Sequence, residues 1–173
     1  VISLSGIVYS ESSRVGGDKM DDSIIQYLKQ KYNLLIGERT SEEIKIQLAS
    51  AHPLSKNLTM EIKGRDLING VPKEVILTER QVAESLSEPV GGIIDAVKTA
   101  LENTAPELAA DIYNTGIYLA GGGALLRGLD KRLSRKTDLP VYIAEDPLQA
   151  VVRGTGITLK NIDRFKTCLL YTS

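Results

Sequence analysis

The chain has 173 residues and a formal net charge of −1, with 42% hydrophobic and 25% charged residues. This length suits one ordinary domain or two small subdomains, and the composition is that of a folded chain. A pI near 5.9 argues against a module that binds nucleic acid through bulk positive charge, so we expect no nucleic-acid partner. The apolar runs fall short of the roughly 20 residues of a membrane span. One Cys and one His exclude a disulfide framework and leave little for a metal site.

Both ends of the chain look cut. Val1 stands inside a predicted strand, and the amphipathic pattern stops before residues 168–173. That last string resembles the translation of an adapter used in DNA sequencing libraries, so we expect a non-native tail there. A frayed apolar terminus is the alternative.

The first half of the chain predicts hairpins and amphipathic helices. The predicted elements are a hairpin over 1–13, helices over 19–33 and 40–51, strands over 58–63 and 73–77 around an Asn-Gly turn, and a helix from 78. Asp18 is the predicted N-cap of the first helix. Two capping boxes, Thr40 with Glu43 and Thr78 with Gln81, predict the starts of the next two.

The second half alternates strand and helix. Pro89 and the two glycines at 91–92 are expected to interrupt the helix that begins at 78. The apolar period then resumes over 93–101. A short helix from 106, a buried strand over 116–120, a leucine-rich helix, a strand over 140–144 and a helix over 147–159 follow. This order predicts an α/β sheet covered by helices. We therefore expect an α/β subdomain from 1–17 and 91–167, with an α+β subdomain inserted over 18–90.

A glycine loop is the most informative candidate site. The predicted strand ends in Gly121, Gly122 and Gly123, and Ala124 opens the predicted helix. Glycines let a ligand approach the backbone, and a helix N-terminus offers free N–H groups to a phosphate. The loop matches neither the P-loop nor the dinucleotide-binding spacing. A tight turn with no ligand is an equal alternative.

Two further features are weaker. Glu42 and Lys45 are three apart in a predicted helix, so they share a face that could meet ribose and adenine or phosphate. A surface charge pair is the simpler interpretation. Gly17 precedes another helix and could be a tight turn or a second backbone approach.

The basic residues predict solvated surface. The run over 127–136 alternates cations with leucines at helical spacing, and is interpreted as a solvated helix face with a smaller chance of meeting acidic partners or lipid headgroups. His52 lies beside Pro53 with no ligating residues around it, and is interpreted as a surface residue.

Several stretches together resemble one family. They are GGDKMDDSII, YNLLIGERTSEEIKIQLASA, ERQVAESLSEPVGGIIDAVK, GIYLAGGGALLRGLDKRL and DPLQAVVRGTG, in family order over about 1–166. The chain resembles the C-terminal half of the MreB family of bacterial actins. The resemblance implies the actin-like ATPase fold, an α/β fold of the ribonuclease H-like type, with ATP and Mg²⁺ between two domains.

The resemblance also implies site residues. Glu42, Glu43, Ile44 and Lys45 match the family's adenosine-contacting helix. Gly121, Gly122, Gly123 and Ala124 match the loop that wraps the nucleotide, and Gly17 matches a backbone near the ribose. The other phosphate loops and catalytic carboxylates belong to the missing half, so no catalytic residue is expected here.

The function implied is that of a filament protein. Members of the family polymerise into membrane-associated filaments in the cytoplasm, direct cell-wall synthesis and maintain rod shape. The implied partners are further copies, cell-elongation proteins of the inner membrane, and the membrane surface through the missing half. A heat-shock chaperone of the same superfamily is the alternative, since it shares a Glu-x-x-Lys helix and a glycine loop.

Overall fold

A computed structural model of the chain describes residues 1–3, 6–52 and 58–165. The expected non-native tail over 168–173 lies outside the described residues. The helices are α1 (Gly17–Tyr32), α2 (Glu38–Leu48), α3 (Glu79–Ser85), α4 (Ser87–Glu102), α5 (Pro106–Thr115), α6 (Leu129–Thr137), α7 (Pro147–Lys160), α8 (Ile162–Phe165) and a 3₁₀ helix, η1 (Gly122–Leu125). The strands are β1 (Ile2–Ser3), β2 (Gly6–Ile7), β3 (Leu34–Leu35), β4 (Thr59–Asp66), β5 (Pro72–Thr78), β6 (Ile117–Leu119) and β7 (Val141–Ile143).

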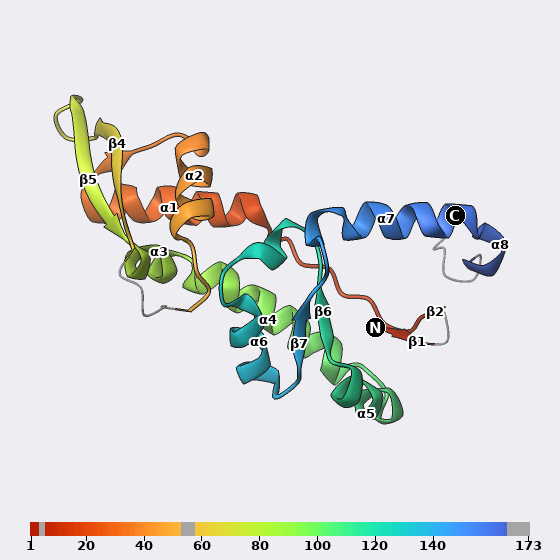
Figure 1. Ribbon diagram of the computed structural model, residues 1–173. Coiled ribbons are helices and arrows are strands. Elements are labelled where there is room, and N and C mark those ends of the chain that lie inside the picture. The colour runs from red at the N-terminus through yellow and green to blue at the C-terminus, as the bar shows by residue number, and fades with distance from the viewer. Residues whose placement is uncertain (4–5, 53–57, 166–173) are drawn as a thin grey trace.

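The strands form three small sheets (Figure 1). β1 and β2 pair antiparallel, which confirms the N-terminal hairpin, although Gly6 lies within the second strand. β3, β4 and β5 form an antiparallel sheet whose long hairpin turns through Gly70 at φ 72°, as the Asn-Gly signal predicts. β6 and β7 are parallel and are connected through η1 and α6, which confirms the predicted strand–helix–strand unit.

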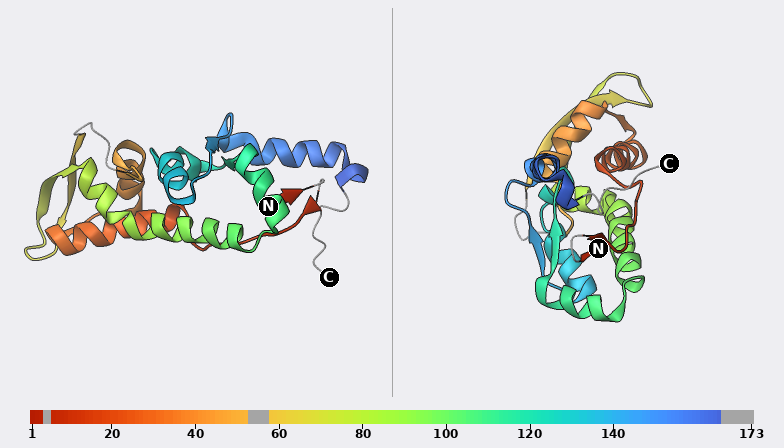
Figure 2. Two further views of the ribbon diagram at one scale, coloured as in Figure 1. Left: turned by 90° about the horizontal axis from the view of Figure 1, so that it is seen from below. Right: turned by 90° about the vertical axis from the view of Figure 1, so that its right-hand side faces the viewer.

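A single buried apolar cluster runs through most of the molecule. In α1 it contains Met20, Ile24 and Leu28, which confirms the amphipathic pattern of that helix. The cluster continues through the three-stranded sheet and α2 to Leu129 and Leu133 of α6. The helices α1 and α4 therefore lie against shared core along one side of the molecule, as the left view of Figure 2 shows.

The far end of the molecule is less covered. α7 extends away from the other elements beside the N-terminal hairpin (Figure 1) and has no buried residue. Its exposed apolar side chains are Leu148, Val151, Val152, Ile157 and Leu159. In the part of the chain that the structure describes, no helix is long and apolar enough to cross a membrane.

Two predicted N-caps, Asp18 and Thr40, are wrong by two and three residues. α1 begins at Gly17 with Gly16 as its N-cap, so Asp18 stands in the first turn, where its charge favours the helix dipole. α2 begins at Glu38 with Gly37 as its N-cap, and Thr40 lies inside the helix. Glycine is an acceptable N-cap, and in both cases it outcompetes a polar side chain further along. The capping box of Thr78 and Gln81 is confirmed.

The predicted helix break and the predicted buried strand also need correction. The break comes at Leu86, and Pro89 stands in the first turn of α4, where its missing N–H costs nothing. Gly91 and Gly92 lie inside α4. The strand β6 is only partly covered, because Tyr118 points outward and is 69% exposed.

Arg127, between η1 and α6, connects two distant parts of the chain. Its guanidinium donates to the carbonyls of Gln47 and Ala49, at 3.2 and 3.1 Å. Its backbone forms a parallel bridge with Ser50, and its carbonyl accepts from Ala51 N–H at 2.8 Å. The end of α2 and the start of α6 are therefore held together through side chain and backbone.

Two isoleucines on α2 test the core assignment. Ile44 is fully buried and Ile46 is 73% exposed on the same helix. We expect Ile44→Ala to lower the free energy of unfolding by about 2–5 kcal/mol, because it leaves a cavity. Ile46→Ala should stay within about 0.5 kcal/mol. Urea unfolding followed by circular dichroism measures both, and equal losses would show that α2 is wrongly oriented.

Candidate functional site

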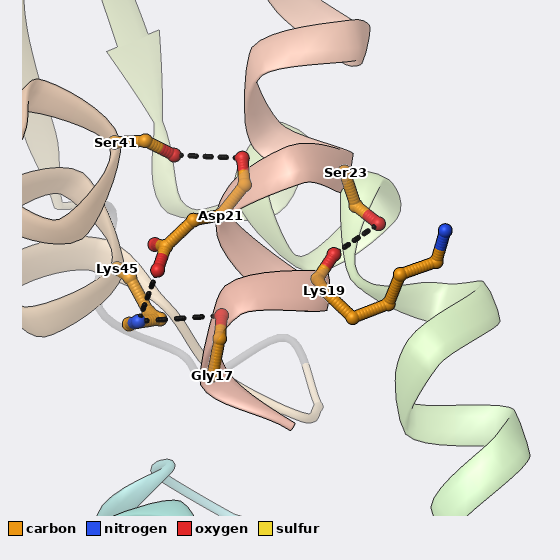
Figure 3. Close-up of polar contacts among 6 residues, drawn as sticks. All are labelled: Gly17, Lys19, Asp21, Ser23, Ser41 and Lys45. Atoms are coloured by element: carbon orange, nitrogen blue, oxygen red, sulfur yellow. Dashed lines mark hydrogen bonds and ion pairs between the residues drawn. The ribbon is translucent and has the colours of Figure 1, made fainter. Parts of the chain in front are cut away.

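A small polar network joins the start of α1 to Ser41 and Lys45 of α2, of which Lys45 stands in the last turn (Figure 3). Lys45 Nζ lies 2.6 Å from Asp21 Oδ2 and donates to the carbonyl of Gly17 at 3.4 Å. The side chains of Lys45 and Asp21 are 18% and 14% exposed, so this ion pair is largely shielded from water. The buried Ser41 hydroxyl donates to the Asp21 carbonyl at 2.8 Å. Together these contacts fix α2 against the first turns of α1.

An open hollow of about 590 Å³ lies beside this network. Its lining residues are Asp18, Asp21, Asp22, Glu38, Arg39, Glu42 and Lys45. Gly17, Glu42 and Lys45, which the sequence singles out, therefore gather at one place. The expected Glu42–Lys45 charge pair does not form, since Lys45 pairs with Asp21 among the described residues.

The other two residues of the predicted helix motif point elsewhere. Glu43 is exposed and pairs with Arg39 at 3.4 Å, one turn earlier on α2. Ile44 is fully buried in the apolar core. Their side chains therefore hold and solubilise the helix, while Glu42 and Lys45 face the hollow.

The glycine loop leaves β6 in a conformation that needs glycine at one position. Gly121 has a φ of 82°, and its N–H donates to the carbonyl of Pro147 at 2.7 Å. A Cβ on Gly122 would only make an ordinary contact with Leu148 at 3.6 Å, and a Cβ on Gly123 would meet nothing within 4 Å. Gly121 thus serves the turn, whereas Gly122 and Gly123 leave open space above the backbone.

The helix expected directly after these glycines does not form. The chain makes the four-residue η1, breaks over 126–128 and only then enters α6. Such a short 3₁₀ turn offers no helix dipole of the kind that binds phosphate. What remains from the prediction is an exposed, unhindered backbone at Gly122 and Gly123, with Ala124 buried beneath it.

The glycine loop borders a different hollow. This one measures about 700 Å³ and lies between the N-terminal hairpin, α4 and β6. Its lining includes Tyr9, Val15, Val97, Leu119, Gly123 and Ala124. The two groups of candidate residues therefore line two separate hollows on this chain.

Sequence reasoning missed the part that Asp21 plays. It is not among the residues that the sequence singles out, yet it is the partner of Lys45. The one available signal is its position beside Met20 at the edge of the buried face of α1. Nothing in the sequence indicates that a residue 24 positions away completes the pair.

The described residues offer no metal site of their own. They contain no group of three or more His, Cys, Asp or Glu side chains that could hold a metal ion. Mg²⁺ usually binds through one or two carboxylates together with nucleotide phosphates. The residues present therefore do not fit an independent Mg²⁺ site.

Comparison with known proteins identifies the family. The sequence model described as MreB/Mbl protein matches residues 1–167. The chain belongs to the MreB/Mbl family. It is 50% identical over 163 residues to the cell shape-determining protein MreB of Escherichia coli K12, a match that covers 94% of this chain and 47% of that protein. It is 45% identical over 164 residues to Mbl of Bacillus subtilis, over 95% of this chain and 49% of that protein. The chain thus spans about half the length of these curated family members.

Solved structures agree with the family's fold. MreB5 of Spiroplasma citri bound to AMPPNP matches with a TM-score of 0.87 and 40% identity, over 91% of this chain and 47% of that one. The MamK double helical filament matches at a TM-score of 0.71 and 21% identity, over 84% of this chain and 44% of that one, and supports the fold alone. The fold is that of the actin-like ATPases, as the resemblance implies. Family membership disfavours the heat-shock chaperone alternative.

The pair of Asp21 and Lys45 can be tested against a neighbouring carboxylate. We expect Asp21→Asn to lower the free energy of unfolding by about 1–3 kcal/mol, because it leaves a shielded ammonium without its counter-charge. Asp22→Asn removes the same charge from an exposed position of α1 and should change it by less than about 0.5 kcal/mol. Urea unfolding at pH 7 measures both. Indistinguishable variants would mean that the pair contributes nothing to stability.

Proposed function

We propose that this chain forms one wall of the ATP-binding cleft of an actin-like filament protein. The observation that carries the proposal is the open backbone of Gly122 and Gly123. A Cβ on Gly122 would make only an ordinary contact with Leu148, and a Cβ on Gly123 would meet nothing within 4 Å. It is supported by the likeness to MreB5, whose solved structures hold AMPPNP and ADP. A nucleotide phosphate or ribose fills the space that a Cβ would otherwise take.

The hollow between α1 and α2 supplies the second part of the proposed contact. Glu42 presents an exposed carboxylate that can accept from hydroxyl groups, and Asp21 holds Lys45 in a fixed position at its edge. Gly17 offers its backbone at the same place. We propose the division into a subdomain from 1–17 and 91–167 and an inserted subdomain over 18–90, so that the adenosine lies where the two parts meet.

Hydrolysis requires groups that these residues do not supply. The chain covers about half of its relatives, and the resemblance assigns the catalytic carboxylates to the other half. When bound, Mg²⁺ would neutralise charge on the phosphates. We propose that ATP hydrolysis belongs to the full-length protein, and that the present chain alone binds ATP weakly or not at all.

The proposed biological role is that of a cytoskeletal filament. Further copies are the first partner, in line with the cell shape-determining function of the relatives. We propose further that the filament lies in the cytoplasm and directs cell-wall synthesis. It would associate there with the inner membrane and with cell-elongation proteins.

The tip of the β4–β5 hairpin is a proposed contact in that filament. Leu67, Ile68 and Val71 are exposed there, Ile68 at 72%. The Asp66 carboxylate accepts from the N–H groups of Ile68 and Asn69, at 2.7 and 3.2 Å, and so fixes the turn that displays them. Exposed apolar side chains on a rigid turn favour a protein contact.

Gly122 tests nucleotide binding. In the full-length protein, we expect Gly122→Val to weaken ATP binding at least tenfold, because its side chain occupies the proposed ligand space. The melting temperature should hardly change, since the Cβ makes only an ordinary contact. The control is Gly154→Val, on an open face of α7. Calorimetry with Mg-ATP measures affinity, and an unchanged affinity would make the loop a structural turn only.

The hairpin tip tests assembly. We expect the double change Leu67→Ser and Ile68→Ser to abolish pelleting of the full-length protein while leaving its thermal melt unchanged. The control pair is Val151→Ser and Val152→Ser, exposed on α7. Sedimentation with ATP measures assembly. Normal pelleting by the hairpin variant would remove the hairpin from the proposed interface.

A further inference from the structure

A third hollow has a strongly basic lining. It measures about 650 Å³ and lies between α3, α6 and the segment that follows α2, three elements that can be traced in Figure 1. Its lining residues are Ala51, His52, Arg80, Ala83, Glu84, Ser87, Arg132, Arg135 and Lys136. None of them lines the hollow of Glu42 and Lys45 or borders the glycine loop. The hollow is therefore separate from the proposed nucleotide site.

The positive charge of this hollow is only partly neutralised by the residues that the structure describes. Arg80, Arg132, Arg135 and Lys136 take part in no ion pair within residues 1–3, 6–52 and 58–165. The remaining residues of the chain include no Asp or Glu at all. The one carboxylate in the lining, Glu84, accepts a hydrogen bond from the Tyr27 hydroxyl at 3.1 Å. Four formal positive charges thus face one negative charge.

Two of the arginines are held in place by the wall. Arg132 Nη1 donates to the Ala51 carbonyl at 2.6 Å, and Arg135 Nη1 donates to His52 Nε2 at 3.1 Å. The Ala51 N–H donates to the Arg127 carbonyl, so the backbone of Ala51 is held by Arg127 through its N–H and by Arg132 through its carbonyl. Guanidinium groups with settled positions lose little freedom when a ligand binds. Arg132 and Arg135 differ in that respect from the mobile cations of a solvated helix face.

The small side chains of the wall leave room for the ligand. Ala51 and Ala83 are buried, and they line the hollow together with the four cations. The volume falls within the range of small-molecule sites, about 300–1,000 Å³. Planar guanidinium forks match the oxygens of phosphate, and several cations together favour a multiply charged anion over a single carboxylate.

We propose that this hollow binds a phosphate-bearing anion with several negative charges. Its contacts come from α3 on one side and α6 on the other. The bound anion would therefore add a connection between the two parts of the chain that Arg127 already joins. The phosphate could belong to a free polyphosphate compound or to the headgroup of an anionic lipid, and the experiment separates these sources.

The test uses inorganic tripolyphosphate and calorimetry on the 173-residue chain at low salt. The test variant carries Arg80→Ala and Lys136→Ala, because neither side chain forms a hydrogen bond or ion pair among the described residues. The control variant carries Lys131→Ala and Lys160→Ala, which remove the same charge from exposed positions outside the hollow. We expect the wild type and the control to bind alike and the test variant to bind at least tenfold more weakly. Binding should weaken as salt is raised.

Vesicles of cardiolipin, whose headgroup carries two phosphates, identify the source of the phosphate. Co-sedimentation that the test variant loses and the control keeps would assign the site to a lipid headgroup. Tripolyphosphate binding without co-sedimentation would assign it to a free phosphate compound. Equal tripolyphosphate affinity in all three proteins, no binding at millimolar concentration, or binding of polyglutamate in preference to tripolyphosphate would each overturn the proposal.

Discussion

The arrangement of this molecule depends on how Arg127 meets the end of α2. Its guanidinium lies 3.9 Å from the carboxylate of Glu79, which is 3% exposed and has no hydrogen-bond partner among the described residues. The same group donates to two backbone carbonyls at the C-terminal end of α2, those of Gln47 and Ala49. A buried carboxylate is costly unless a counter-charge is near. Arg127 therefore joins α2, α3 and the start of α6, and a shift of any one of these helices would break its contacts with the others.

The elements of the fold were predicted to different degrees, for physical reasons that differ. The period of Met20, Ile24 and Leu28 predicts α1 because a helix that packs on one face needs apolar residues every turn. The capping box of Thr78 predicts α3 because it is a local hydrogen-bond pair. The strand β3 is only two residues long and carries no pattern of its own. Its position is set by pairing with β4, which no local signal indicates.

The candidate site divides in the same way. Glu42 and Lys45 share a helix face that spacing alone predicts, and the run of glycines indicates an open backbone. The spacing leaves ligand binding and a plain turn or charge pair open, and the proposal that those groups form a nucleotide wall comes from the resemblance. Asp21, which positions Lys45, and the basic hollow of Arg80 and Arg132 depend on contacts between distant residues. Tertiary packing decides such contacts, and the local sequence pattern therefore indicates only a solvated surface for these cations.

The Arg127 connection also bears on how far the intervening chain can change in length. The residues it joins are 78 and 80 positions apart, and the β4–β5 hairpin, α3, α4 and α5 all lie between them. The entropy of closing so long a loop grows only with the logarithm of its length, and doubling the loop costs only about 0.6 kcal/mol. Insertions at the hairpin tip or between α4 and α5 would therefore leave the connection almost as favourable as before. A longer hairpin or a longer connection between α4 and α5 would thus be compatible with the same joint between the two parts of the chain.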